Sequence, residues 1–188
     1  MLVKELLQNI NEKGILLANK FYIDIRYPAN FMKEFKPDIT ERMVELRASE
    51  VNLAGRNLTT FEEPNIYGPI RSVPEGVSYA EDISISFIDT RALECRKLFE
   101  LWQETTFTHD NWNLGYYNDI IGDIDIITLD DNLEATYGIT CYEAYPKTIG
   151  PLPLSSTPTT EAVRTTLGFA FRYWKRMPVV KSEKKFSN

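Results

Sequence analysis

Few residues of this chain are of types that carry out chemistry, and their spacing favours no particular reaction. The single histidine, His109, lies between Thr108 and Asp110 in a polar segment. One histidine cannot build a histidine-based metal cluster, and it disfavours nucleophile schemes that depend on an imidazole. We interpret His109 as an ordinary surface residue. The nine glycines are scattered along the chain and form no phosphate-binding loop.

Acidic residues gather in one segment, which contains Asp123, Asp125, Asp130 and Asp131. They lack the spacing of a calcium loop and its closing bidentate glutamate. Asp123 and Asp125 are two positions apart on a predicted strand, so they share its outward face while Ile124 and Ile126 point inward. We interpret this face as solvated. A carboxylate pair of the glycosidase type stays an alternative, because such partners meet only in three dimensions. No catalytic residue, metal site or cofactor is predicted.

Length and cysteine usage indicate one domain with a large core. A domain of 188 residues buries about 70% of its unfolded surface and needs neither a disulfide nor a metal to hold it together. Cys95 and Cys141 lie in apolar patterns, and we interpret both as core thiols.

The charge of the chain is unevenly distributed. The net charge is −6, and residues 175–188 contain five basic residues and one acidic residue. Residues 1–174, the predicted domain, are therefore acidic and a poor match for nucleic acid. We interpret the basic tail as a solvated end, although it could contact an acidic partner. Charges within the N-terminal apolar pattern argue against a signal peptide, and no run approaches the roughly 20 apolar residues of a membrane span. Synthesis in the cytoplasm is expected.

The segment around which the chain is organised runs from a strand directly into a helix. Residues 82–89 alternate between apolar and polar, which is typical of a half-buried strand. The period then changes to that of a helix, with Asp89 or Thr90 as a suitable N-cap. The helix presents one apolar stripe, predicted to face the core: Cys95, Leu98, Phe99 and Trp102.

The remaining elements are predicted mainly as strands. A short amphipathic helix is expected at residues 2–13. Strands are expected at residues 21–27, 40–48, 56–61, 121–129, 133–144 and 163–174. Residues 62–78 contain three prolines and two glycines, which predicts a long loop. Its apolar residues need a surface to pack against, so a partner surface is as reasonable as a mobile loop. The pattern indicates a mainly β fold that carries a single packed helix.

Several ordered motifs between residues 19 and 174 resemble the tail tube proteins of contractile-tailed bacteriophages. They are NKFYIDI at 19–25, VNLAGRNL at 51–58, EEPNIYGP at 62–69, FID at 87–89, FELWQ at 99–103, YYND at 116–119, YPKTIGP at 145–151 and FAFRYW at 169–174. Each motif is weak alone, whereas the ordered set is specific. The chain departs from the family at Ala54, where proline is common, and in a longer stretch at 28–38.

The resemblance implies a sandwich or barrel of two antiparallel sheets whose six copies close into a ring. Rings would stack into the inner tube of a virion tail, with sheath and baseplate proteins as partners and no membrane. DNA would pass through the lumen without specific binding. Within this picture, an axial contact between rings is expected at Pro64, Ile66, Tyr67 and Pro69, and Asp123 and Asp125 are expected to face the lumen.

Other readings stay open on the sequence alone. The chain could be a tube-initiating protein of a baseplate, or a tube protein of a related contractile injection or secretion system. A monomeric β-sandwich that binds a partner would explain the aromatic loops. A carboxylate-dependent hydrolase would explain the acidic strands.

Overall fold

The structure is a computed structural model that describes residues 16, 19–29, 31, 44–64, 67–79, 82–107, 112–154 and 162–178. The expected N-terminal helix at 2–13, most of the basic tail, Ile66 and His109 lie outside these residues.

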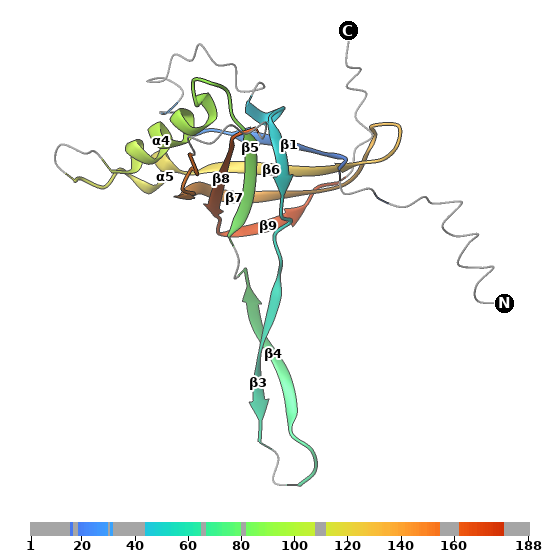
Figure 1. The fold of residues 1–188 in the computed structure, drawn as a ribbon. Helices are drawn as coiled ribbons and strands as arrows, with labels where there is room; N and C mark the ends of the chain where they lie inside the picture. Colours follow the sequence, from blue (N-terminus) through green and yellow to red (C-terminus); the bar gives the residue numbers. More distant parts are fainter. Residues whose placement is uncertain are drawn as a thin grey trace.

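The described strands form one bent antiparallel sheet and one separate two-stranded ribbon (Figure 1). The sheet has seven strands in the order β1-β6-β7-β8-β5-β2, and β9 also pairs with β7. Its strands are β1 (Phe21–Arg26), β2 (Ala48–Val51), β5 (Ile83–Ile88), β6 (Gly122–Leu129), β7 (Ala135–Ile149), β8 (Arg164–Ala170) and β9 (Tyr173–Arg176). Strand β7 belongs to both halves of the sheet, since it pairs first with β6 and β9 and then with β8. The halves pack as two antiparallel layers without closing into a barrel, which confirms the predicted fold class.

The core lies between the two halves and is covered by helix α4 (Glu94–Thr106). The helix buries Cys95, Leu98, Phe99 and Trp102 against the inward isoleucines and phenylalanines of the strands. The buried indole of Trp102 donates a hydrogen bond from Nε1 to the carbonyl of Ile120, 2.8 Å away. Its single polar group is thus satisfied, so the large ring is buried without an unpaired donor.

Asp89 connects the end of β5 to the start of α4. Its carboxylate accepts hydrogen bonds from the backbone N–H groups of Cys95 and Arg96 at 3.1 Å and from the hydroxyl of Thr165 at 3.0 Å. The residue that directly precedes the helix, Leu93, is in the left-handed region with φ of 52° and has no side-chain cap. Asp89 therefore caps the first amides of α4 although it is not adjacent to the helix in the sequence, and its bond to Thr165 fixes α4 to β8.

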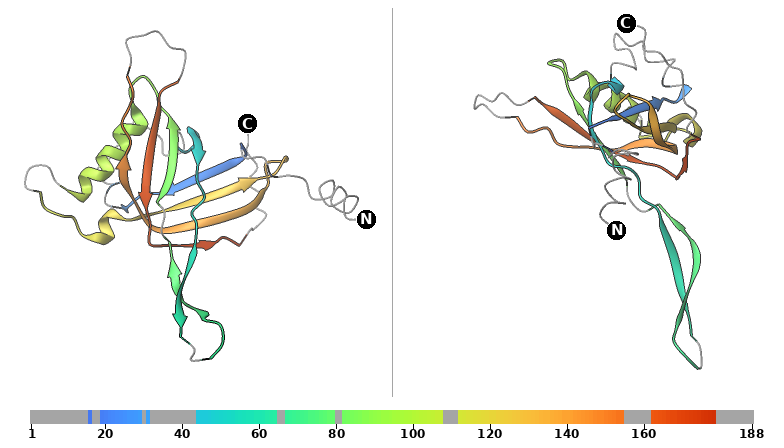
Figure 2. Two further views of the ribbon diagram at one scale, coloured as in Figure 1. Left: turned by 60° about the horizontal axis from the view of Figure 1, so that its bottom comes forward. Right: turned by 90° about the vertical axis from the view of Figure 1, so that its right-hand side faces the viewer.

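Residues 62–78 are not the predicted loop but contribute most of a β-hairpin. Strands β3 (Asn57–Glu63) and β4 (Arg71–Ser78) pair with each other and project from the body, as Figure 2 shows from two sides. Pro74 lies within β4 opposite Thr60, next to a register shift. A two-stranded ribbon has an open edge on each side, so a proline whose missing N–H falls on the outer edge breaks no cross-strand bond.

Three other strand boundaries differ from the prediction. Of the expected strand at 40–48, residues 40–43 lie outside the described residues, Val44 and Glu45 are helical, and β2 begins at Ala48. Strand β7 continues through Pro146, and the expected last strand is divided into β8 and β9. The chain bends between these two strands while both stay paired to β7. A short helix α5 (Tyr117–Ile120) was not predicted.

Candidate assembly surfaces

The β3–β4 ribbon is the most exposed ordered element of the molecule. All seven residues of β3 are exposed, and the ribbon extends away from the body in every view (Figures 1 and 2). Near its turn, Gly68 has φ of 96°, a conformation that a residue with a Cβ adopts only under strain. Pro64, Tyr67 and Pro69 lie at this turn and are exposed, with Tyr67 at 92%.

Apolar side chains occupy both faces of the ribbon. Leu58 pairs with Val77 across the strands, and Phe61 pairs with Val73. Residues 58 and 61 are three positions apart in β3, and the register shift between the two pairs gives β4 one extra residue, so the pairs lie on opposite faces. Leu58, Phe61 and Val77 are 64%, 47% and 52% exposed. An isolated two-stranded hairpin is marginally stable in water, and this one leaves apolar surface on both sides.

The root of the ribbon is attached to the body by an aromatic cluster. Trp174 on β9 donates a hydrogen bond from Nε1 to the carbonyl of Gly55 at 3.1 Å, and the Arg56 guanidinium lies 5.1 Å from the Trp174 ring centre. Tyr79, just after β4, contacts Phe171 and Trp174 edge-on, with ring centres 6.1 and 6.3 Å apart. These contacts set the direction in which the ribbon leaves the sheet, because they hold both of its strands at the base.

Asp123 and Asp125 share the outward face of β6, but they do not form a solvated acidic surface. Asp125 is only 3% exposed and receives both Nη atoms of Arg26, at 2.9 and 3.1 Å. Arg26 also lies 3.5 Å from Asp123, whose other oxygen accepts the backbone N–H of Glu143. The interpretation of a solvated acidic face is therefore wrong for Asp125. A bidentate pair with arginine largely neutralises its carboxylate.

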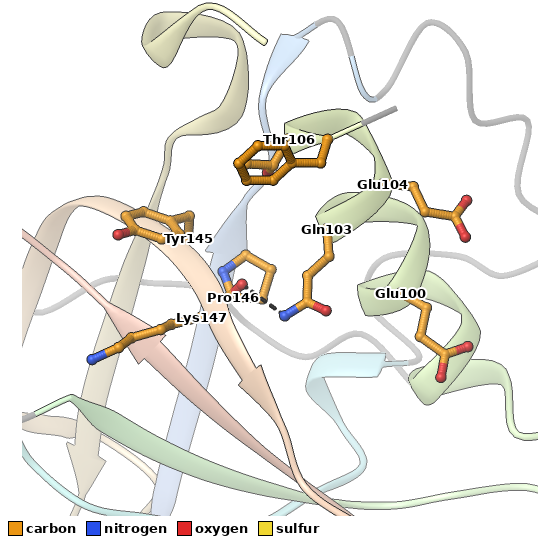
Figure 3. A pocket seen from close by; sticks show the side chains of 8 residues that line it. Glu100, Gln103, Glu104, Thr106, Tyr145, Pro146 and Lys147 are labelled. Carbon is orange, nitrogen blue, oxygen red and sulfur yellow. Dashed lines mark hydrogen bonds between the residues drawn. The ribbon is translucent and has the colours of Figure 1, made fainter. Parts of the chain in front are cut away.

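Helix α4 covers an edge of β7 and forms a shallow groove with it. The side chain of Gln103 donates to the carbonyl of Pro146 at 3.0 Å (Figure 3). Arg96 donates to the carbonyl of Gly150, also at 3.0 Å. The groove has a volume of about 480 Å³, and Lys147 on its rim pairs with Asp82. This ion pair raises the pKa of Lys147. Because α4 occupies the backbone acceptors of this edge, the edge is protected from pairing with another strand.

The described residues contain neither a metal-binding cluster nor an exposed cysteine. No group of three or more histidine, cysteine, aspartate or glutamate side chains among them could hold a metal ion. Cys95 and Cys141 are buried, and burial raises the pKa of both thiols, to about 12 for Cys141. Such thiols are poor nucleophiles at neutral pH. Neither described helix is long and apolar enough to cross a lipid bilayer.

The structure brings together only part of the residue set expected from the sequence. Pro64, Tyr67 and Pro69 lie at one end of the ribbon, whereas Ile66 is outside the described residues. The apolar surface of the ribbon strands was missed, and so was the pairing of Arg26 with both aspartates. Leu58 and Phe61, each among polar neighbours, were the available signal for the first. The second depends on strand register, which no local pattern reports.

Comparison with known proteins gives one family match and several similar structures. A family model described as phage tail tube protein matches residues 16–177. No curated protein sequence matches the chain. A chain of the anti-feeding prophage tube-terminating cap superposes with a TM-score of 0.62 and 11% identity, covering 88% of this chain and 92% of that one. A chain of the PVC sheath/tube terminator, from an extracellular contractile injection system, superposes with a TM-score of 0.61 and 11% identity, covering 88% of this chain and 98% of that one. A chain of the 6-fold symmetrised anti-feeding prophage baseplate superposes with a TM-score of 0.59 and 13% identity, covering 89% of this chain and 98% of that one.

The bent sheet with one covering helix and a projecting ribbon is thus a β fold shared with chains from contractile injection assemblies. The family match extends over most of the chain, from the residues before β1 to the end of β9. The chain belongs to the phage tail tube protein family, a family of structural tube proteins.

Proposed function

We propose that this chain forms rings of six copies that stack into the inner tail tube of a contractile phage tail. The exposed β3–β4 ribbon carries this proposal. It projects from the body and presents apolar pairs on both faces. A surface of this kind in a stable subunit requires a cover, and a second copy of the same chain is always available to provide one.

The division of strand edges fits assembly through a limited set of contacts. The edge of β7 beside α4 is occupied by helix side chains, and β2 and β9 have four residues each. Short or covered edges resist uncontrolled pairing, and Glu45 accepts the N–H of Ile25 at the outer edge of β1, so association is directed to the ribbon. A head-to-tail contact that closes by rotation gives a ring, and repetition along the axis gives a tube.

The proposed tube would carry DNA during ejection, with Asp123 and Asp125 on the lumen side. Their pairing with Arg26 changes the physical basis of this proposal, because the wall would present neutralised ion pairs and few free carboxylates. A wall with little net charge still lets DNA pass, since it offers no cluster of cations that would bind the phosphates and release the counterions of the DNA.

Sheath and baseplate proteins are the proposed partners, and the tail of a virion is the proposed location. A tube-initiating protein or a tube protein of an injection system is the second candidate. It is favoured by the similarity to chains from a cap, a baseplate and a terminator. A monomeric binding module would leave the apolar ribbon uncovered. We propose no enzymatic role.

The proposal is tested by negative-stain electron microscopy and light scattering of the purified chain over a range of concentrations. Rings at low concentration and tubes at high concentration are expected. A protein that stays monomeric at every concentration and salt would refute ring and tube formation.

Replacement of Tyr67 and Ile70 by serine tests the role of the ribbon. These side chains are 92% and 64% exposed, so their loss should leave the subunit folded. Rings should still form and long tubes should be lost. Tyr116→Ser is the matched control, because Tyr116 is 85% exposed and lies outside the ribbon. Tubes of normal length in the double variant would contradict the axial role.

A further inference from the structure

The end of the body opposite the ribbon combines exposed apolar side chains with exposed arginines. Its apolar residues are Leu46, Ile88 and Val163, which are 66%, 41% and 37% exposed. Arg91 and Arg164 are exposed beside them. Neither arginine makes an ion pair with any of the described residues. We call this surface, made of these five residues, the basic end.

Strand register places the basic end and the ribbon at opposite ends of the same half-sheet. Strand β5 starts close to the last residue of β4 and finishes at Ile88, which lies opposite Arg164 in the ladder with β8. The backbone N–H of Ile88 also bonds to the carbonyl of Arg47, and that of Asp89 bonds to the carbonyl of Val163. The start of α4 lies at this end, away from the projecting ribbon (Figures 1 and 2).

Within the part of the chain that the structure describes, the carboxylates near the basic end have other partners. Glu94 is used by Arg47, which lies 2.8 Å away and lowers the pKa of the Glu94 carboxyl. Asp89 is used by the helix amides and by Thr165. The two exposed arginines are therefore the charges that this end presents outward.

The outer part of the ribbon has the complementary composition. Three exposed glutamates, Glu62, Glu63 and Glu75, outnumber the one arginine of this part, Arg71, among the described residues. Tyr67 and Ile70 supply exposed apolar surface at the same place. One end of the molecule is thus acidic and apolar, and the other is basic and apolar.

We propose that the basic end is the docking site for the ribbon tip of a second copy of this chain, an inference that rests on the proposed function. Two different complementary surfaces at opposite ends make a heterologous contact, which repeats without closing and generates a filament along its axis. The arginines select the acidic tip and fix its orientation, while the apolar residues on both sides are removed from water. This names the surface that the ribbon contacts in the neighbouring ring.

Directed cross-linking tests the contact itself. Both native cysteines are buried, so cysteines introduced by Ser72→Cys and Ala162→Cys, at exposed positions next to the two surfaces, are the reactive ones when treated with a short bifunctional maleimide. A ladder of covalent multimers is expected from tubes of this variant. The control combines Ser72→Cys with Leu101→Cys, because Leu101 is 38% exposed but lies in the middle of α4. Equal ladders from both variants, or a ladder from the control alone, would overturn the inference.

A charge exchange tests the complementarity. Arg91→Glu with Arg164→Glu should raise the concentration needed for tube formation by about tenfold, because like charges would then face each other. Adding Glu62→Arg and Glu63→Arg restores the wild-type net charge and should restore assembly. Failure of this rescue, with circular dichroism showing a folded protein, would count against the contact.

The two proposals fail differently. If the unmodified protein forms no tubes, the proposed function is refuted. If it forms tubes but neither cross-linking nor charge exchange has the expected effect, only the assignment of the basic end is refuted.

Discussion

Replacing Glu45 by glutamine should remove a specific part of the pH dependence of folding. Glu45 closes the outer edge of β1: one carboxylate oxygen accepts the backbone N–H of Ile25 at 3.1 Å, and the other lies 3.4 Å from the hydroxyl of Tyr22. The residue is 7% exposed. Burial, with a smaller contribution from nearby Asp24, raises the pKa of Glu45 from 4.5 to about 6 despite the bond to Ile25.

The sign of the effect follows from proton binding. Between pH 4.5 and about 6 the folded state keeps the proton on Glu45, and the unfolded state releases it. The free energy of unfolding therefore falls as the pH rises through this window. A shift of this size corresponds to about 2 kcal/mol, and solvent screening at the edge of the sheet reduces the expected value to about 1 kcal/mol. Glutamine keeps the acceptor for Ile25 but cannot titrate, so this decrease should disappear.

The assay is urea unfolding followed by tryptophan fluorescence, at a protein concentration where light scattering shows no assembly. The difference in unfolding free energy between pH 4.5 and 7.5 is compared for the wild type and Glu45→Gln. Glu94 and Glu143 have lowered pKa values, so their contributions are lost only as the pH falls below 4.5, outside the window. Glu45→Ala is the control for the hydrogen bond, since it leaves the Ile25 N–H without an acceptor and should lower the free energy of unfolding at both pH values. Identical pH profiles for the wild type and the glutamine variant would refute the reasoning.

Three further substitutions test the contacts that hold the fold. Trp102→Ala should lower the unfolding free energy by about 3–5 kcal/mol, because it removes a fully buried ring, and a wild-type melting temperature would contradict this. Asp89→Ala should cost about 1–3 kcal/mol through loss of the helix amide acceptor, and Asp89→Asn should cost less, as urea unfolding would show. Arg26→Met should cost about 2 kcal/mol by leaving Asp125 buried and unpaired, and adding Asp125→Asn should recover most of it. A double variant no more stable than the single one would argue against the pairing.

Local periodicity in the sequence predicted the elements that pack one face against the core. The alternation of residues 82–89 and the helical stripe that follows it both correspond to β5 and α4, because a buried face demands the same period along the whole element. The turn at Asp130 was also predictable from the sequence, since an aspartate at this position accepts the N–H groups of Asn132 and Glu134.

Features that depend on partners far apart in the chain were not predictable in this way. Pro74 suggested a loop because the rule against proline assumes a strand with neighbours on both sides, and β4 has only one. Asp125 shares a face of β6 with Asp123, as strand alternation requires, but its burial depends on Arg26, which meets it only through the register of β1 and β6. The bend between β8 and β9 leaves no mark in the alternation, because both strands keep the same partner, β7.

The self-paired ribbon also has a consequence for the kinetics of growth. Its backbone bonds are supported only by two strands, so its amides should exchange with deuterium much faster than those of β6 and β7 in a free subunit. Two free subunits that meet must order their ribbons at the moment of contact, which slows the start of a new stack. A subunit that joins an existing stack meets a surface that is already formed. In the proposed tube, growth on a seed would then be faster than spontaneous growth, and below the concentration at which tubes form without seeds their number would follow the number of seeds.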